Sequence, residues 1–111
     1  MKPEIICICG SSRFCDRIAV SKWQFEKEGK IAIGLHLLPR WYGEMTGKTE
    51  SHHFAEQENI ADVLDELHLR KIDLADRVHI ANYDGYIGER TAIEIDYAKK
   101  LNKPITYEES P

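Results

Sequence analysis

The feature that most constrains the fold is a short apolar run near the N-terminus. Residues 4–9 read EIICIC, and the run ends at the turn-forming residues GSS at 10–12. A strand whose side chains are apolar on both alternating faces suits burial on both faces, as in a parallel sheet. The run therefore predicts a parallel strand that is covered on two sides.

The rest of the chain alternates between helical and strand patterns. Apolar residues at helical spacing predict three helices, at residues 13–29, 54–76 and 90–103. Short runs rich in β-branched residues predict three further strands, at residues 30–35, 77–82 and 104–109. Gly29 is expected to end the first helix and Thr91 to cap the third, and the second helix is expected to break near residue 70.

This alternation indicates an α/β fold with helices on both faces of a parallel sheet. Right-handed crossovers leave few topologies, and we expect a small doubly wound sheet of four strands, a flavodoxin-like or Rossmann-like three-layer sandwich. The 111 residues are enough for one compact domain, 1–111, and too few for two.

The composition argues against several broad classes. A net charge of −4 disfavours a binder of nucleic-acid polymers, which usually carries a basic excess. The sequence lacks the run of about 18 apolar residues that a membrane span needs, and MKPEIICICG lacks the features of a signal peptide. We therefore expect a cytoplasmic protein in which Cys7, Cys9 and Cys15 are free thiols.

Ligands of an open parallel sheet bind outside the carboxyl ends of its strands. Three segments should converge there: residues 10–13, the segment after Leu35, and residues 83–91. Glu94 lies about one turn inside the last helix, so the same geometry places its carboxylate at the mouth of the sheet. The alternative is an ordinary helix glutamate that reaches solvent or forms an ion pair with Lys99 or Arg90.

The turn after the first strand offers groups that suit a small anion. Gly10 allows close approach to the backbone, Ser11 and Ser12 supply hydroxyls, and Arg13 adds a positive charge. Together with the N–H groups of the next helix they could hold a phosphate or a sugar hydroxyl. The alternative is a glycine turn with a serine as helix cap.

The histidines and cysteines do not show zinc-site spacing, so neither a metal nor a cofactor is expected. Cys7 and Cys9 share one face of the first strand and are expected to pack as small core residues. Residues 36–53 are predicted to form a long loop. In it, Trp41 and Tyr42 could stack on a nucleobase, anchor the loop on the core, or lie in a dimer interface.

Four motifs occur in an order that resembles a known family. CGSSRF, LADRVHI, AIEIDYA and NKPITY are similar to the hallmarks of the nucleoside 2-deoxyribosyltransferase-like superfamily, which includes 2′-deoxynucleoside 5′-monophosphate N-hydrolases. The resemblance covers most of the chain and is weakest across residues 30–60. It implies a small-molecule nucleoside or nucleotide as ligand and a homo-oligomer, such as a dimer.

The resemblance also implies roles for individual residues. Glu94 matches the glutamate that attacks the anomeric carbon of the deoxyribosyl group. The group that protonates the leaving base stays open between Asp84, Glu89 and Tyr86. The expected substrate-binding residues are Gly10, Ser11, Ser12, Arg13, His68, Tyr86, Gly88 and Thr91.

The sequence departs from the family pattern at three places, and these departures keep other functions open. His68 stands where the family often has Asp, Gly88 where it often has Asp or Ser, and Asp96 where it usually has Gly. The expected activity is cleavage or transfer at the N-glycosidic bond. The alternatives are a non-catalytic nucleotide-binding or sensor module that uses the same pocket, and a structural partner subunit.

Overall fold

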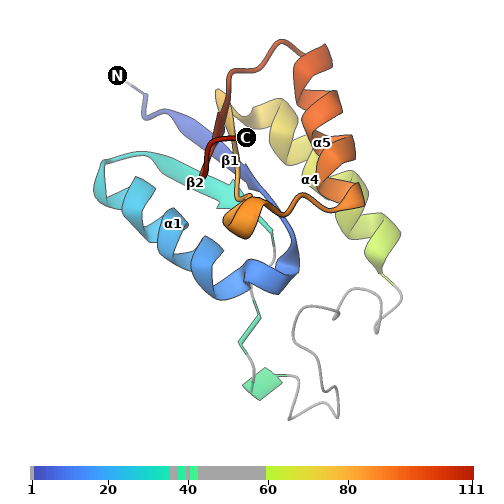
Figure 1. Ribbon diagram of the computed structural model, residues 1–111. Coiled ribbons are helices and arrows are strands. Elements are labelled where there is room, and N and C mark those ends of the chain that lie inside the picture. The colour runs from blue at the N-terminus through green and yellow to red at the C-terminus, as the bar shows by residue number, and fades with distance from the viewer. Residues whose placement is uncertain (1, 36–37, 40, 43–59) are drawn as a thin grey trace.

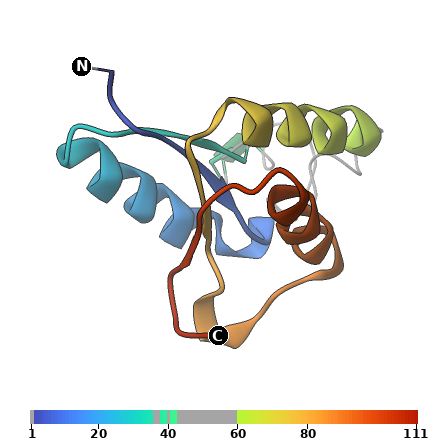
Figure 2. The same cartoon turned by 90° about the horizontal axis from the view of Figure 1, so that it is seen from above.

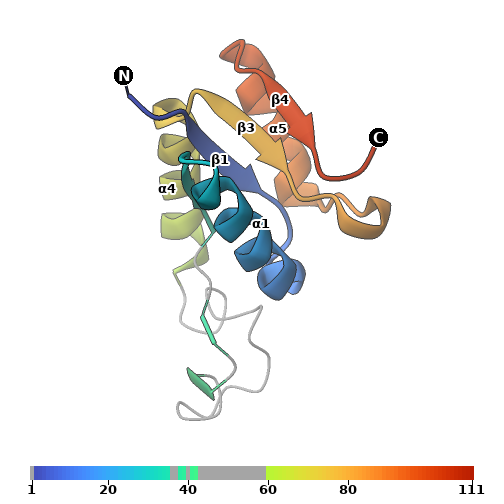
Figure 3. The ribbon, with the colours of Figure 1, turned by 90° about the vertical axis from the view of Figure 1, so that its left-hand side faces the viewer.

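The structure is a computed structural model that describes residues 2–35, 38–39, 41–42 and 60–111. The elements in chain order are β1 (Ile5–Cys9), η1 (Ser12–Phe14), α1 (Cys15–Lys27), β2 (Ile31–Gly34), α4 (Ala61–Leu74), β3 (Arg77–Ile80), η3 (Tyr83–Gly85), α5 (Glu89–Lys100) and β4 (Ile105–Tyr107). The four strands form one sheet of order β2-β1-β3-β4, and every pairing is parallel. Helix α1 covers one face, and α4 and α5 cover the other (Figures 1 to 3). The expected doubly wound, Rossmann-like α/β fold is confirmed.

The strand β1 separates two halves of the core. Ile6 and Ile8 face α1, where they pack with Ile18. Cys7 and Cys9 face the opposite layer, where their cluster includes residues of α4 and α5. All four β1 side chains are at most 1% exposed, so the apolar run does cross the centre of the sheet, as the sequence predicts.

Two details of the predicted helices are wrong. Helix α4 runs without a break past residue 70, because its sequence ADVLDELHLRKIDL contains no Pro or Gly to interrupt it. Arg70 forms ion pairs with Glu66 at 3.5 Å and Asp73 at 3.2 Å along the helix. The N-cap of α5 is Gly88, and Thr91 lies in the first turn as a buried residue. Residues 54–59, the start of the second predicted helix, lie outside the described residues.

The predicted loop 36–53 also lies largely outside the described residues. Within it, Trp41 is 59% exposed, and its ring packs edge-to-face against Tyr42 with 6.4 Å between the centroids. None of the described helices combines the length and the apolar character that crossing a membrane requires.

At Gly34 the backbone of β2 lies unusually close to the backbone of β1. A Cβ atom on Gly34 would lie 2.7 Å from the carbonyl oxygen of Ile8, which cannot move without disturbing the sheet. A similar restriction holds at Gly10, where a Cβ atom would lie 2.9 Å from the Cβ of Ala81. Gly34 ends the edge strand β2 and Gly10 follows the central strand β1, so both glycines also shape the carboxyl edge of the sheet, where ligands of such folds bind.

We predict that Gly34→Ala lowers the free energy of unfolding by about 1–3 kcal/mol, because the added methyl group forces β2 away from β1. Gly88→Ala is the control, since its Cβ atom would meet only the Tyr86 side chain, with the hydroxyl nearest at 3.1 Å, and its loss is limited to that of a glycine N-cap, below about 1 kcal/mol. Urea denaturation of the two variants measures the difference. Equal stability of both variants would contradict the steric explanation.

Candidate functional site

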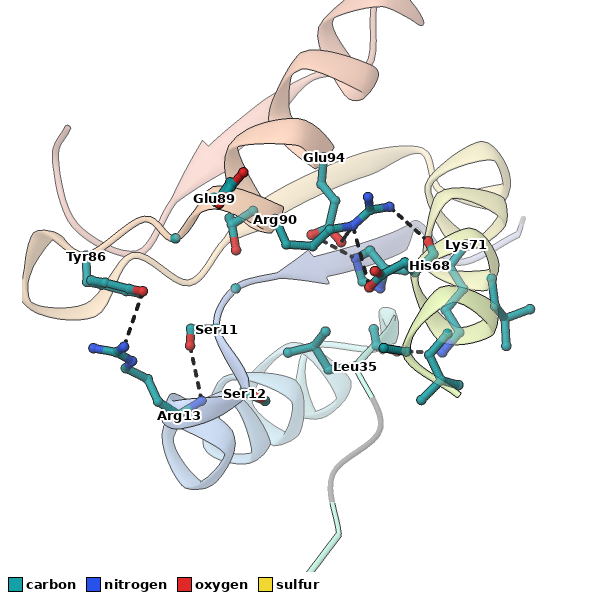
Figure 4. A pocket seen from close by; sticks show the side chains of 18 residues that line it. Ser11, Ser12, Arg13, Leu35, His68, Lys71, Tyr86, Glu89, Arg90 and Glu94 are labelled. Carbon is teal, nitrogen blue, oxygen red and sulfur yellow. Dashed lines mark hydrogen bonds and ion pairs between the residues drawn. The ribbon is translucent and has the colours of Figure 1, made fainter. Parts of the chain in front are cut away.

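A cleft of about 360 Å³ opens at the carboxyl ends of β1 and β2. Its walls come from the turn after β1, the end of β2, one side of α4 and the start of α5 (Figure 4). Because β1 lies between β2 and β3, the chain connections leave the sheet in opposite directions here, which is the usual ligand position in doubly wound folds.

Most of the residues predicted from the sequence line this cleft. They are Gly10, Ser11, Ser12, Arg13, His68, Tyr86, Gly88, Glu89, Thr91 and Glu94. Asp84 lies outside the described lining, and its carboxylate forms an ion pair with Arg17 at 3.3 Å. The backbone of Asp84 has a φ of 57°, in the left-handed region, within the short helix η3.

Glu94 belongs to the stripe of α5 that faces the sheet. Thr91, Glu94, Ile95 and Ala98 are the buried residues of this helix, at the spacing of one helical face. Glu94 is only 3% exposed although its side chain lines the cleft. The exposed position that the sequence left open as an alternative therefore does not apply, but the ion pair with Arg90 does, at 3.5 Å.

Two basic groups balance the buried carboxylate. Its Oε1 lies 3.6 Å from Nε2 of His68, and its Oε2 lies 3.5 Å from Nε of Arg90. Figure 4 shows these three side chains converging from α4 and α5. Burial raises the pKa of Glu94 above its ordinary value, and the charges of His68 and Arg90 offset this only in part.

Arg90 also ties α5 to α4. Its Nη2 donates to the backbone carbonyl of Asp65 at 3.1 Å, and its Nε lies 3.6 Å from Oδ1 of Asp65. The same Nε is buried and lacks a hydrogen-bond partner among the described residues. The Arg90 Nε therefore lies between the carboxylates of Asp65 and Glu94 without a hydrogen bond to either. This N–H group is available to donate to a ligand in the cleft.

The two cysteines of β1 contact the same histidine. Nε2 of His68 lies 3.1 Å from Sγ of Cys9 and 3.7 Å from Sγ of Cys7. A hydrogen bond from Cys9 is the main cause that lowers the pKa of Cys7 to about 6, and that bond raises the pKa of Cys9. Burial lowers the pKa of His68, but the hydrogen bond with Cys7 and the charge of Glu94 outweigh it, so this pKa is raised.

Sequence reasoning placed Cys7 and Cys9 on one strand face but missed their contact with His68. His68 follows Cys9 by 59 positions and Cys7 by 61 positions in the sequence, so the contact depends on how α4 packs over the sheet. Lys71 was missed as well. It lines the cleft one turn beyond His68, and its Nζ donates to the carbonyl of Gly34 at 2.6 Å.

The turn after β1 shows the serine cap that the sequence left open as the alternative to a binding role. Ser11 accepts a hydrogen bond from the backbone N–H of Arg13 at 3.2 Å and so caps η1. The Arg13 guanidinium lies 3.9 Å from the centroid of the Tyr86 ring and donates to its hydroxyl at 3.2 Å. This stacked pair lies across the cleft mouth from His68 (Figure 4).

The cleft therefore offers two sets of groups. Arg13, Lys71 and Arg90 can attract an anion, and Asp65, Glu89 and Glu94 can accept protons or hydrogen bonds. Beneath them, Cys7, Cys9 and His68 form a cluster whose ligand atoms all lie within 4.8 Å of one another. Comparison with models of protein families, with curated proteins and with solved structures finds no significant match.

We predict that Arg90→Met lowers the free energy of unfolding by about 1–3 kcal/mol, because it leaves the Glu94 carboxylate buried beside fewer positive charges. Arg70→Met is the control, since the Arg70 side chain is 50% exposed and surface ion pairs contribute about 0–1 kcal/mol. Urea denaturation should also show that Glu94→Gln in the Arg90→Met background recovers part of the loss. A loss no larger than that of Arg70→Met would contradict this role.

Proposed function

We propose that the protein cleaves or transfers the N-glycosidic bond of a 2′-deoxynucleoside or of its 5′-monophosphate, with Glu94 as nucleophile. The observation that supports this most is the position of Glu94: a carboxylate that is 3% exposed, yet lines a cleft beside Gly10 and Ser11 at the strand ends. A helix rarely buries an acid on its core-facing stripe unless the acid is paired or used.

The chemistry requires a carboxylate that can approach one face of a sugar ring. An oxygen of Glu94 attacks C1′, the C1′–N bond breaks, and its electron pair leaves with the base. Water or a second base then attacks C1′, which releases the sugar and restores the carboxylate. His68 and Arg90, at 3.6 Å and 3.5 Å, hold the carboxylate in place before the attack.

Glu89 is the candidate for protonating the leaving base. It lines the cleft and is the first residue of α5, on the same helix as Glu94. Asp84 is a weaker candidate, because its carboxylate pairs with Arg17 and lies outside the described lining. The hydroxyl of Tyr86 also lines the cleft and already accepts a hydrogen bond from Arg13.

The turn after β1 suits the 5′ side of the sugar. Gly10 leaves room for close approach, and Ser11, Ser12 and Arg13 line the cleft beside it. These groups can hold a 5′-hydroxyl or a 5′-phosphate. The small size of the cleft, about 360 Å³, is in the range of sites for small organic ligands.

Release of free base from deoxynucleosides and their 5′-monophosphates tests the proposal. We expect Glu94→Ala to lower the rate by at least about 10³-fold, because it removes the attacking atom. Asp96→Asn is the matched control, an exposed acid on the same helix. Full turnover by Glu94→Ala, or a failure of the parent protein to act on any of these substrates, would remove the proposed activity.

Glu89→Gln provides a second test, aimed at the departure of the base. We expect a rate loss of about 10²–10⁴-fold with natural bases, as for loss of a general acid. The loss should shrink for a substrate whose leaving group needs no proton, such as a nitrophenyl deoxyriboside. An equal loss with both substrates would assign Glu89 a structural role.

The non-catalytic alternative gives a different result in the same experiment. A nucleotide-binding or sensor module would retain the deoxynucleotide intact, and chromatography of the bound ligand would show nucleotide without free base. The replacement of the family's Asp by His68 is the observation that favours this alternative.

A further inference from the structure

The cluster beneath Glu94 has the composition of a transition-metal site. Cys7 and Cys9 come from β1 and His68 comes from α4, and all three residues are at most 4% exposed. Their sulfur and nitrogen atoms lie within 4.8 Å of one another. Thiolate and imidazole ligands favour zinc and related ions over magnesium or calcium.

The distances around His68 match the edges of a coordination tetrahedron. With zinc–sulfur bonds of about 2.3 Å and zinc–nitrogen bonds of about 2.0 Å, neighbouring ligand atoms stand about 3.3–3.8 Å apart. Nε2 of His68 lies 3.1 Å from Cys9 Sγ, 3.7 Å from Cys7 Sγ and 3.6 Å from Glu94 Oε1. Three of the six edges, those that meet at this nitrogen, are thus close to the required separation, and a turn of the Glu94 side chain toward the two sulfur atoms would complete the set.

We propose that Cys7, Cys9 and His68 bind a zinc-class metal ion, and that the Glu94 carboxylate, which lies 3.6 Å from Nε2 of His68 but outside the group that the three other ligand atoms form, turns to become the fourth ligand. Each thiol loses its proton to solvent as its sulfur binds the metal. Two thiolates and a carboxylate carry three negative charges against the two positive charges of the ion. Arg90, 3.5 Å from Glu94, supplies a further positive charge that offsets the remainder.

The site also has an entry route and a supporting shell. His68 and Glu94 line the cleft, so an ion can reach the cluster from solvent through the same opening as a substrate. Arg90 holds the outer oxygen of the carboxylate. Ile72 and Val78 are fully buried and belong to the apolar cluster around the cysteines, which restricts the access of water.

Metal binding would also control the proposed activity, and this part of the inference rests on the proposed function. A carboxylate that coordinates a metal cannot attack a sugar carbon at the same time. The metal-loaded protein is therefore the inactive form, and removal of the metal by a chelator restores base release.

Cobalt(II) titration of the metal-free, reduced protein tests the site directly. We expect one Co(II) per chain, with the ultraviolet charge-transfer absorption of cobalt–thiolate bonds, and a zinc-dependent rise in Tm of several degrees. Cys7→Ser and Cys9→Ser should each remove most of the thiolate absorption. Cys15→Ser is the matched control and should retain it, because Cys15 lies on α1 and outside the cluster.

The parent protein alone can overturn the inference, so the result does not depend on whether the variants fold. Absence of thiolate absorption with Co(II) would leave Cys7 and Cys9 as core residues, as the sequence predicts. Absorption that survives in Cys7→Ser and Cys9→Ser, but is lost in Cys15→Ser, would overturn the assignment too.

The two proposals fail in different ways. Thiolate absorption without base release by the metal-free protein would remove the proposed enzyme and keep the metal site. Base release that is insensitive to zinc, together with absent thiolate absorption, would remove the metal site and keep the enzyme.

Discussion

Burial of β1 from both sides is the constraint on which the rest of the structure depends. Ile6 and Ile8 pack toward α1, and Cys7 and Cys9 pack toward α4 and α5. Strands β2 and β3 pair with the two edges of β1, and the carboxylate of Asp76 accepts a hydrogen bond from the N–H of Ile5 at 2.8 Å. In this central position the backbone of β1 pairs along both edges, and the strand ends at Gly10, where the cleft opens.

The same strand gives the site its unusual electrostatics. A strand with only aliphatic residues toward α4 would leave His68 and Glu94 facing hydrocarbon, whereas Cys7 and Cys9 supply polarisable sulfur atoms at 3.7 Å and 3.1 Å from the imidazole. Burial raises the pKa of the Glu94 carboxyl, and His68 and Arg90 counter this from two directions. The protonation state of Glu94 therefore depends on the charges of His68 and Arg90.

The features that could be predicted from the sequence are those that depend on short-range patterns of residues. The apolar run of β1 predicted the sheet, and the position of Glu94 on the helix after the last cleft loop predicted its place at the strand ends. Patterns could not show contacts that need the packing of distant elements, such as His68 with Cys7 and Cys9, or Arg90 with Asp65. They also missed the left-handed backbone of Asp84, because a single residue at positive φ leaves no periodic signal.

Glu94 connects the two proposals, and they make opposite demands on it. As a nucleophile it needs a free oxygen that points into the cleft. As a ligand it turns Oε1, which lies 3.6 Å from Nε2 of His68, toward the ion that Cys7, Cys9 and this nitrogen would hold. Oε2 beside Arg90 can stay in place in either state. Small rotations of one side chain would then separate a form that holds a metal from a form that attacks a sugar. An Asp in place of His68 would lack the imidazole on which that choice depends.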